Sequence, residues 1–357
     1  MNVRADIIKP PKQDIFKSGK FRSYLVQAIV LILFFGFVIW VIDNASTNMK
    51  ANGIAHGFDF LWENSMFDIG YLPFIDHTPV HTYFHAFLVG LLNTILVAVI
   101  GIFFATILGF LVGIGRLSNN WLVSRFCGFY VELFRNIPLL LQLFFWYHAV
   151  LRILPRAKNS LQAGDSFFLN IKGLFLPKPI PEAGFNSVLL TFLIAIIAII
   201  FLWRWAEKRQ AKTGQQFPIF YTSLAIIILP IIFVSYLYNF PMYLEQPVLK
   251  GFNFKGGIRL IPELVALLLA LSMYTASFIA ENVRSGILAI SKGQIEAANA
   301  VGLKRVPILR LVVIPQALRV IIPPLTSQYL NLTKNSSLGI AVGYADLVHG
   351  FGGISLN

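Results

Sequence analysis

The chain has 357 residues, of which 57% are hydrophobic and 13% are charged, whereas about a quarter of the residues of a soluble protein are charged. This composition, with several uncharged runs of about 18 residues or more, excludes an ordinary soluble protein and predicts an all-α polytopic membrane protein. The formal net charge of +13 does not indicate a nucleic-acid partner, because most basic residues cluster beside apolar runs, where they fix the orientation of the spans.

The N-terminal region is predicted to hold one span. Residues 1–22 are rich in lysine and are expected to form a cytoplasmic arm, which places the N-terminus inside. Residues 23–85 comprise a charge-free run, Tyr24–Ile42, and a loop that contains five acidic residues and one lysine. Because Lys and Arg are sparse in non-cytoplasmic loops, this loop is expected to lie outside.

Three histidines near the end of this loop have the spacing of metal ligands on a helix. His77, His81 and His85 recur every fourth residue and would share one helix face. Pro79 interrupts such a helix, and no cysteine or clear carboxylate partner completes a ligand set. We therefore predict interfacial histidines and no metal site.

Residues 86–154 are predicted to form the first core spans. The run Ala86–Gly115 contains Gly109 and Gly113, a spacing that permits two helices to approach closely in a membrane. The segment Phe126–Val150 is expected to cross the membrane next, as one span.

Charged residues and a proline in that second segment predict local features. A charge at the centre of a span costs about 2.5–3.5 kcal/mol, so Glu132 and Arg135 are expected near the cytoplasmic end or paired with each other. A structural ion pair is the preferred interpretation, and a functional role is the alternative. Pro138 is expected to kink the helix or to free a carbonyl group.

The remaining spans are predicted by alternation across the membrane. Residues 155–258 are interpreted as an outside loop and an inserted pair of spans joined by a basic inside loop, with Pro230 interrupting the second span. Residues 259–282 form the next core span and residues 283–319 a cytoplasmic stretch. Residues 320–357 form a last core span and an outside tail, which gives about seven spans.

The cytoplasmic stretch of residues 283–319 is amphipathic. Glu296, Ala297 and Ala298 are strong helix formers and are predicted to open a short helix. Gly302 is expected to take a positive φ and to end it, and Pro307 to begin a second short helix. Helix, turn and helix with basic flanks suit docking to a soluble partner at the membrane surface. The alternative is an ordinary basic connecting loop.

The spacing of this stretch resembles the EAA loop of importer-type ABC transporter permeases. The matching positions are Glu296, Ala297, Ala298, Gly302, Val312, Ile314 and Pro315. The segments YVELFRNIPLLLQLFFWY and VVIPQALRVIIPPLTSQYLNLTKNSSL resemble the polar amino acid branch of that family, and most of the chain is similar to the larger permease of general L-amino-acid importers. The resemblance implies the type I ABC importer permease fold, in which an eighth span is expected beyond the point where this sequence ends.

The resemblance also implies a function and partners. Residues 283–319, the coupling stretch, would dock into a groove on an ATPase that holds ATP and Mg. The resemblance implies three kinds of partner, namely two ATPase subunits, a second homologous permease in a heterodimer, and a periplasmic amino-acid-binding protein. It also implies that the protein lies in the bacterial inner membrane. Expected cargo is L-amino acids, polar or acidic ones such as glutamate, glutamine, aspartate and asparagine, moved by alternating access. The chain has no GxxxxGK[ST] loop and is expected to be no enzyme and to hold no cofactor.

Two sets of candidate residues follow. Coupling to the ATPase is assigned to Glu296 as a polar contact, to Ala297 and Ala298 for close packing, to Gly302 for the turn, and to Lys304 and Arg305. A substrate path is assigned to polar residues in or beside spans, namely Asn93, Thr94, Gln142, Thr275, Ser277, Gln328 and Asn331. For each of these seven, the alternative is a side chain that satisfies a backbone carbonyl or holds helices together.

Three other functions remain open from the sequence. A secondary transporter driven by an ion gradient would carry ionisable residues at span centres, which nearly all spans here lack. A membrane-embedded enzyme would need catalytic groups clustered at one depth, whereas the His, Asp and Glu residues lie mostly in loops. A structural subunit without its own substrate contacts is the third.

Overall fold

A computed structural model describes residues 19–51, 58–69 and 78–353. The chain forms two compact units, one of residues 1–64 with 82–84 and one of residues 65–81 with 85–357. Residues 1–18 of the predicted arm and the candidate ligand His77 lie outside the described residues. Among the described residues, no group of three or more His, Cys, Asp or Glu could hold a metal ion, and the rings of His81 and His85 stack on each other.

Six helices in the described chain are long and apolar enough to cross a membrane, so the prediction of a polytopic helical protein is confirmed. The long helices are α1 (Gly19–Ala51), α2 (Tyr83–Gly115), α5 (Phe185–Thr213), α6 (Ile219–Leu237), α7 (Pro262–Leu288) and α10 (Ile314–Asn335). Within its own unit, no side chain of α1 from Arg22 onward is buried. The seventh span stays a prediction, because the additional apolar helical segment, 139–153, is short.

Helix α7 lies at the centre of the larger unit, and two glycines of α2 bring these helices together. A Cβ atom on Gly109 would lie 2.5 Å from Cγ2 of Ile279. A Cβ atom on Gly113 would lie 2.7 Å from the carbonyl oxygen of Ala280 and 2.8 Å from Cβ of Val283. The close helix approach predicted from the G-x-x-x-G spacing is therefore confirmed.

The segment predicted as one span over Phe126–Val150 is broken in the structure. It comprises α3 (Trp121–Asn136), α4 (Leu139–Phe144) and a π-helical turn, Phe145–Val150. The break confirms the prediction for Pro138, which lacks an N–H and takes an extended ψ of 137°. Nε2 of Gln142 donates to the freed carbonyl oxygens of Phe134 and Ile137, each at 2.9 Å.

Two other helices run straight through prolines. Helix α6 continues past Pro230, where an interruption was predicted, and α10 continues past Pro323 and Pro324. Prolines are tolerated inside membrane helices because neighbouring groups satisfy the freed carbonyls. Helix α10 therefore extends in one piece from Ile314 to Asn335.

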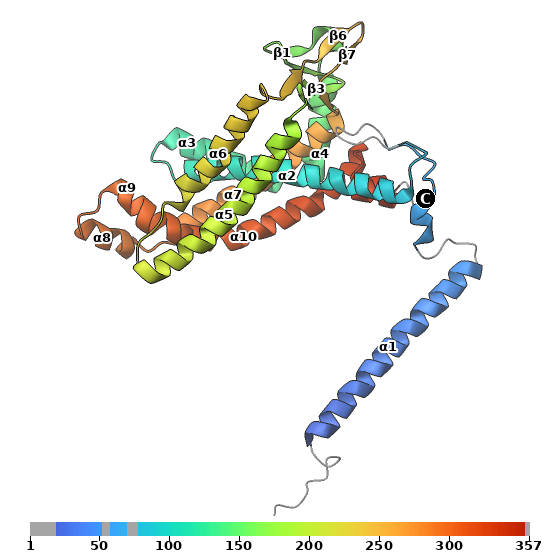
Figure 1. The fold of residues 1–357 in the computed structure, drawn as a ribbon, viewed down its shortest axis with the longest axis horizontal. Coiled ribbons are helices and arrows are strands. Elements are labelled where there is room, and N and C mark those ends of the chain that lie inside the picture. The colour runs from blue at the N-terminus through green and yellow to red at the C-terminus, as the bar shows by residue number, and fades with distance from the viewer. Residues whose placement is uncertain (1–18, 52–57, 70–77, 354–357) are drawn as a thin grey trace, which may run out of the picture. The chain divides into compact units, whose positions relative to one another are not determined.

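The loops on either side of α5 and α6 contain short antiparallel strands that the sequence interpretation missed. Strands β1 (Leu161–Ala163), β2 (Phe167–Asn170), β3 (Gly173–Leu176) and β8 (Ile258–Leu260) form one sheet in this order. Strand β4 (Lys178–Pro181) pairs with β5 (Met242–Glu245), and β6 (Val248–Lys250) pairs with β7 (Asn253–Lys255). Because β4 precedes α5 and β5 follows α6, their pairing closes the base of the α5–α6 helical hairpin (Figure 1).

Contacts between distant segments show which loops share an end of the larger unit. Arg116, directly after α2, pairs with Glu281 near the end of α7. The hydroxyl of Tyr147 donates to Oε1 of Glu263, at the start of α7, at 2.8 Å. The turn after α2 therefore lies at the end where the coupling stretch begins, and the π-helical turn lies at the opposite end. This arrangement agrees with the alternation predicted from loop charge.

Candidate functional site

The coupling stretch forms two short helices around a tight turn. Helix α8 (Lys292–Ala300) begins four residues before the predicted start at Glu296, because Ser291 already has the extended backbone of an N-cap residue. Gly302 has a φ of +83°, which confirms the positive φ predicted for the residue that ends the helix. Its N–H donates to the carbonyl oxygen of Asn299 at 2.9 Å.

The predicted second short helix is also present. Helix α9 (Arg305–Ile308) begins two residues before Pro307, which lies within its first turn. A π-helical turn, Leu309–Val313, then leads directly into α10.

The stretch has a small apolar core of its own. Ala298 is 7% exposed and packs with the buried side chains of Ile308 and Val313, against which Ile295 and Leu303 are half-buried. Residues of α8 and α9 therefore pack against each other around Ala298. The hairpin is therefore a packed unit rather than a loose connection.

The other candidate coupling residues lie on its exposed surface. Glu296, Ala297, Gly302, Lys304 and Arg305 are all exposed. Val301 and Val306, which flank the turn, are 81% and 72% exposed. Charged groups around apolar tips make a surface that suits a protein partner better than lipid or water alone.

The hairpin is held between α7 and α10, which pack against each other. Gly286 of α7 allows this approach, because a Cβ atom there would collide with the side chain of Ile321 in α10. Ile321 and Ala317 are buried in the same core as Val283 of α7. Figure 1 shows α8 and α9 projecting beyond the ends of these two helices. The hairpin is thus connected at both ends to long helices that pack on each other.

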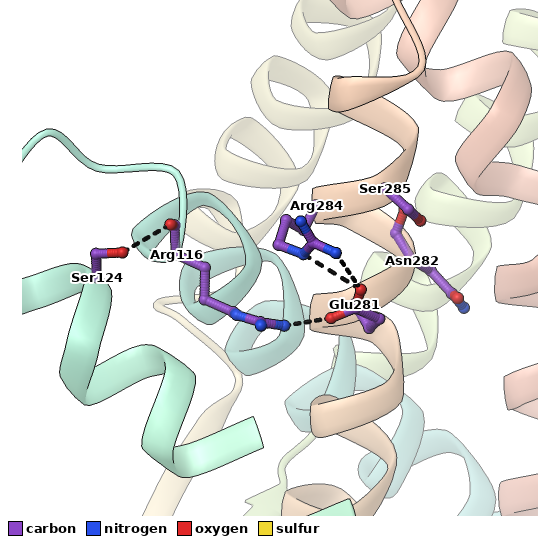
Figure 2. A network of polar contacts seen from close by, with 6 residues as sticks. All are labelled: Arg116, Ser124, Glu281, Asn282, Arg284 and Ser285. Atoms are coloured by element: carbon purple, nitrogen blue, oxygen red, sulfur yellow. Dashed lines mark hydrogen bonds and ion pairs between the residues drawn. The ribbon is translucent and has the colours of Figure 1, made fainter. Parts of the chain in front are cut away.

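A charged network lies where α7 leaves the bundle (Figure 2). Glu281 accepts from Arg116 through Oε2 and from Nη2 of Arg284 through Oε1, at 2.6 Å in the second case. Ser124 of α3 donates to the carbonyl oxygen of Arg116 at 2.9 Å. The network ties α2, α3 and α7 together at the base of the coupling stretch.

Sequence reasoning missed this network. The available signal was an acidic residue at the end of one predicted span and an arginine directly after another, at the same predicted side. The preferred ion pair of Glu132 with Arg135 was wrong, since no ion pair links them among the described residues. Both residues instead line a cavity with Glu281, which agrees with the other expectation, a place near that end of the spans. The guanidinium of Arg135 lies over the ring of Phe278, 5.1 Å from its centroid.

Replacing Glu281 by glutamine is expected to destabilise the folded chain by about 1–2 kcal/mol, because two partly buried arginines lose their shared anion. The measurement is thermal unfolding in detergent of Glu281→Gln, of Arg116→Gln and of the double variant. Non-additive losses are expected, as for groups in one network. Glu207→Gln, at an exposed site on α5, is the control. If the loss in the double variant equals the sum of the two single losses, the Arg116–Glu281 contact does not contribute to stability.

Two candidate substrate residues of α2 hold the chain segment that follows α10. Nδ2 of Asn93 donates to the carbonyl oxygen of Ala345 at 2.7 Å, and Oγ1 of Thr94 accepts from the N–H of Leu347 at 3.0 Å. The hydroxyl of Thr94 donates in turn to the carbonyl oxygen of Gly90. Both side chains therefore satisfy backbone groups of a packed segment.

The same segment contains two buried residues that sequence reasoning did not single out. Tyr344 and Asp346 are each 1% exposed. Burial raises the pKa of the Asp346 carboxyl above its ordinary value, while its Oδ1 accepts from the N–H of His349 at 2.8 Å. A lone acid in a glycine-rich tail was the only available signal.

The other candidates are dispersed over three helices. Gln142 of α4 and Ser277 of α7 are buried and donate to backbone carbonyls, Ser277 to that of Tyr274 at 2.6 Å. Thr275, also on α7, is buried as well. Gln328 is half-buried and Asn331 is exposed, both on α10. No hydrogen bond joins any two of the seven candidates in the described part of the chain.

Comparison with known proteins identifies one matching family and relatives that are similar in sequence over nearly the whole chain. Residues 213–349 match the family described as "Binding-protein-dependent transport system inner membrane component". The chain is 52% identical to the general L-amino acid transport system permease protein AapQ of Rhizobium johnstonii, over 95% of this chain and 84% of that protein. It is 41% identical to the glutamate/glutamine/aspartate/asparagine transport system permease protein BztB of Rhodobacter capsulatus, over 98% of this chain and 89% of that protein.

Proposed function

The chain belongs to the family of amino-acid ABC transporter permeases, and we propose that it carries polar and acidic L-amino acids inward, driven by ATP hydrolysis on a separate subunit. It is a multi-pass inner-membrane permease subunit without catalytic activity of its own. Relatives named for general L-amino acid transport and for glutamate, glutamine, aspartate and asparagine transport support this range of cargo.

One observation carries the proposal: the coupling stretch is a packed hairpin with an exposed face, clamped between two core helices. Its buried residue Ala298 keeps α8 against α9, while Glu296 and Ala297 on the same helix face outward. A hairpin built in this way can be pushed as one body by a partner that binds its outer face. The proposed partner is an ATPase that binds ATP and Mg.

The other proposed partners are a second permease and a periplasmic amino-acid-binding protein. The family description, which names binding-protein-dependent transport, supports the latter. Large apolar side chains remain exposed along α2, α5 and α6, in numbers that lipid, a second permease or both would cover. Each subunit would contribute half of the path for the amino acid.

Within this chain, Gln328 and Asn331 are the proposed substrate-path residues of first choice. Their amides can both donate to a carboxylate and accept from an ammonium group, as a zwitterionic amino acid requires. The five other candidates are engaged with backbone groups or buried within the helix core. These five are better explained as structural contacts.

Replacing two neighbouring alanines by aspartate, one at a time, separates an effect on docking from an effect on folding. Ala298→Asp is expected to unfold the hairpin, because it buries a charge without a partner, and to lower the melting temperature of the chain. Ala297→Asp, one residue away on the exposed face, is expected to leave the melting temperature unchanged while weakening ATPase binding. Copurification with the ATPase and thermal unfolding measure the two effects. Equal melting temperatures of both variants would contradict the assignment.

The function is tested by uptake into proteoliposomes that contain the chain, its partner permease and the ATPase. Labelled glutamate and glutamine are expected to accumulate only with ATP on the ATPase side and binding protein on the other. Uptake that proceeds without ATP and collapses with an ionophore would instead identify an ion-gradient-driven transporter.

A further inference from the structure

A cavity of about 770 Å³ lies at the same end of the larger unit as the coupling stretch. Its walls are the turn after α2, residues of α3 between Trp121 and Glu132, and Arg284 of α7. The polar groups that line it include Arg116, Ser118, Asn119, Arg125, Glu132 and Arg284. None of the roles described above uses this cavity, although Arg116 and Arg284 of the Glu281 network line it.

The cavity carries an excess of positive charge. Its lining contains three arginines, Arg116, Arg125 and Arg284, and one acidic residue, Glu132. Arg116 and Arg284 share Glu281 behind the wall. Arg125 is exposed and forms no ion pair or hydrogen bond with any described residue. The guanidinium of Arg125 is thus available to bind an anion from outside the chain.

The remaining groups favour an acceptor-rich anion. The hydroxyl of Ser118 accepts from the N–H of Asn120 at 3.2 Å, so its own proton stays available to donate. Planar guanidinium groups with a hydroxyl beside them match the geometry of a phosphate, which accepts several hydrogen bonds at once.

The rim of the cavity is apolar and continues along α3. Trp121 and Phe129, both lining residues, are 74% and 62% exposed. Leu122 and Phe126, at 68% and 72%, extend this face along the helix. An exposed apolar face with aromatic residues beside a basic pocket is typical of a helix at the membrane interface.

We propose that this cavity binds the phosphate headgroup of an anionic phospholipid, with the acyl chains lying on the apolar face of α3. Basic pockets between membrane helices bind such headgroups. A free phosphate ion shares the headgroup chemistry, but only a lipid also covers Trp121, Phe126 and Phe129. The lipid would brace α3 against α7 at the base of the coupling stretch.

The test is native mass spectrometry of the full chain in detergent, titrated with phosphatidylglycerol, with phosphatidylcholine or with inorganic phosphate. Wild type is expected to bind phosphatidylglycerol in preference to both. Arg125→Gln is expected to weaken that binding about five-fold, while Arg125→Lys keeps most of it. Arg204→Gln, an exposed arginine on α5 remote from the cavity lining, is the matched control and should bind as wild type does.

Glu132→Gln is a second test variant, for which a gain in lipid binding is expected, and a misfolded protein would not show such a gain. Removing the one carboxylate of the lining is expected to strengthen phosphatidylglycerol binding. Equal binding of phosphatidylglycerol and phosphatidylcholine would overturn the proposal, as would unchanged binding by both Arg125→Gln and Glu132→Gln. Inorganic phosphate that binds as well as the lipid would show a free anion site instead.

Discussion

Replacing Gly302 by aspartate is expected to reduce ATP-driven uptake by about 5- to 150-fold, the range of typical coupling energies, while ATP hydrolysis continues. Gly302 has a φ of +83° and open space where a Cβ atom would lie. Aspartate adopts this left-handed conformation more readily than most residues, so the hairpin should still fold. The added charge then lies at the exposed tip, where we propose that the ATPase binds.

The control for this variant is Gly214→Asp. Gly214 also has a positive φ, +69°, with nothing near its Cβ position, and it ends α5 rather than the coupling stretch. The strain and the new charge are therefore matched, and uptake by this variant should stay near the wild-type rate. Uptake and ATP hydrolysis are measured on the same proteoliposomes. Unimpaired uptake by Gly302→Asp, or equal loss in both variants, would remove the coupling role.

Replacing Gly113 by valine is expected to prevent stable assembly of the core. The new Cβ atom would lie 2.7 Å from the carbonyl oxygen of Ala280, a backbone atom that cannot swing away. Overpacking of this kind costs about 1–3 kcal/mol or more, and here it separates α2 from the central helix. The expected result is little monodisperse protein in detergent and a lowered melting temperature.

Gly36→Val is the matched substitution at a helix glycine whose Cβ position is open. Gly36 lies in α1 with nothing within 4 Å of its Cβ position. Yield and melting temperature should therefore stay close to wild type. A melting temperature of Gly113→Val equal to that of Gly36→Val would contradict the close helix contact.

Much of the fold was predictable because its determinants are local or periodic. Long uncharged runs gave the membrane helices, and the Gly109/Gly113 spacing gave a close contact that the structure confirms. The β strands were not predictable from pattern. With three or four residues each, they are too short to show alternation, and their pairing across α5 and α6 depends on tertiary structure.

The candidate site likewise has features that were predictable from local sequence and features that depend on tertiary packing. The turn at Gly302 follows from one residue's freedom to take a positive φ, and its spacing to nearby helix formers marks it in the sequence. The Arg116–Glu281 contact joins residues 165 positions apart, and only the packing of α2 on α7 brings them together. Likewise, nothing local distinguishes Asn93, which binds a distant carbonyl, from Asn331, which binds none among the described residues.

The central claim is that the exposed face of α8 contacts an ATPase in the cell interior. Cys127 is the only cysteine, so Ala297→Cys in a Cys127→Ser background gives a single label at that face. A membrane-impermeant maleimide is expected to react with it in inside-out vesicles, not in intact spheroplasts, and bound ATPase should block the reaction. Labelling in intact spheroplasts, or no protection by the ATPase, would contradict the claim.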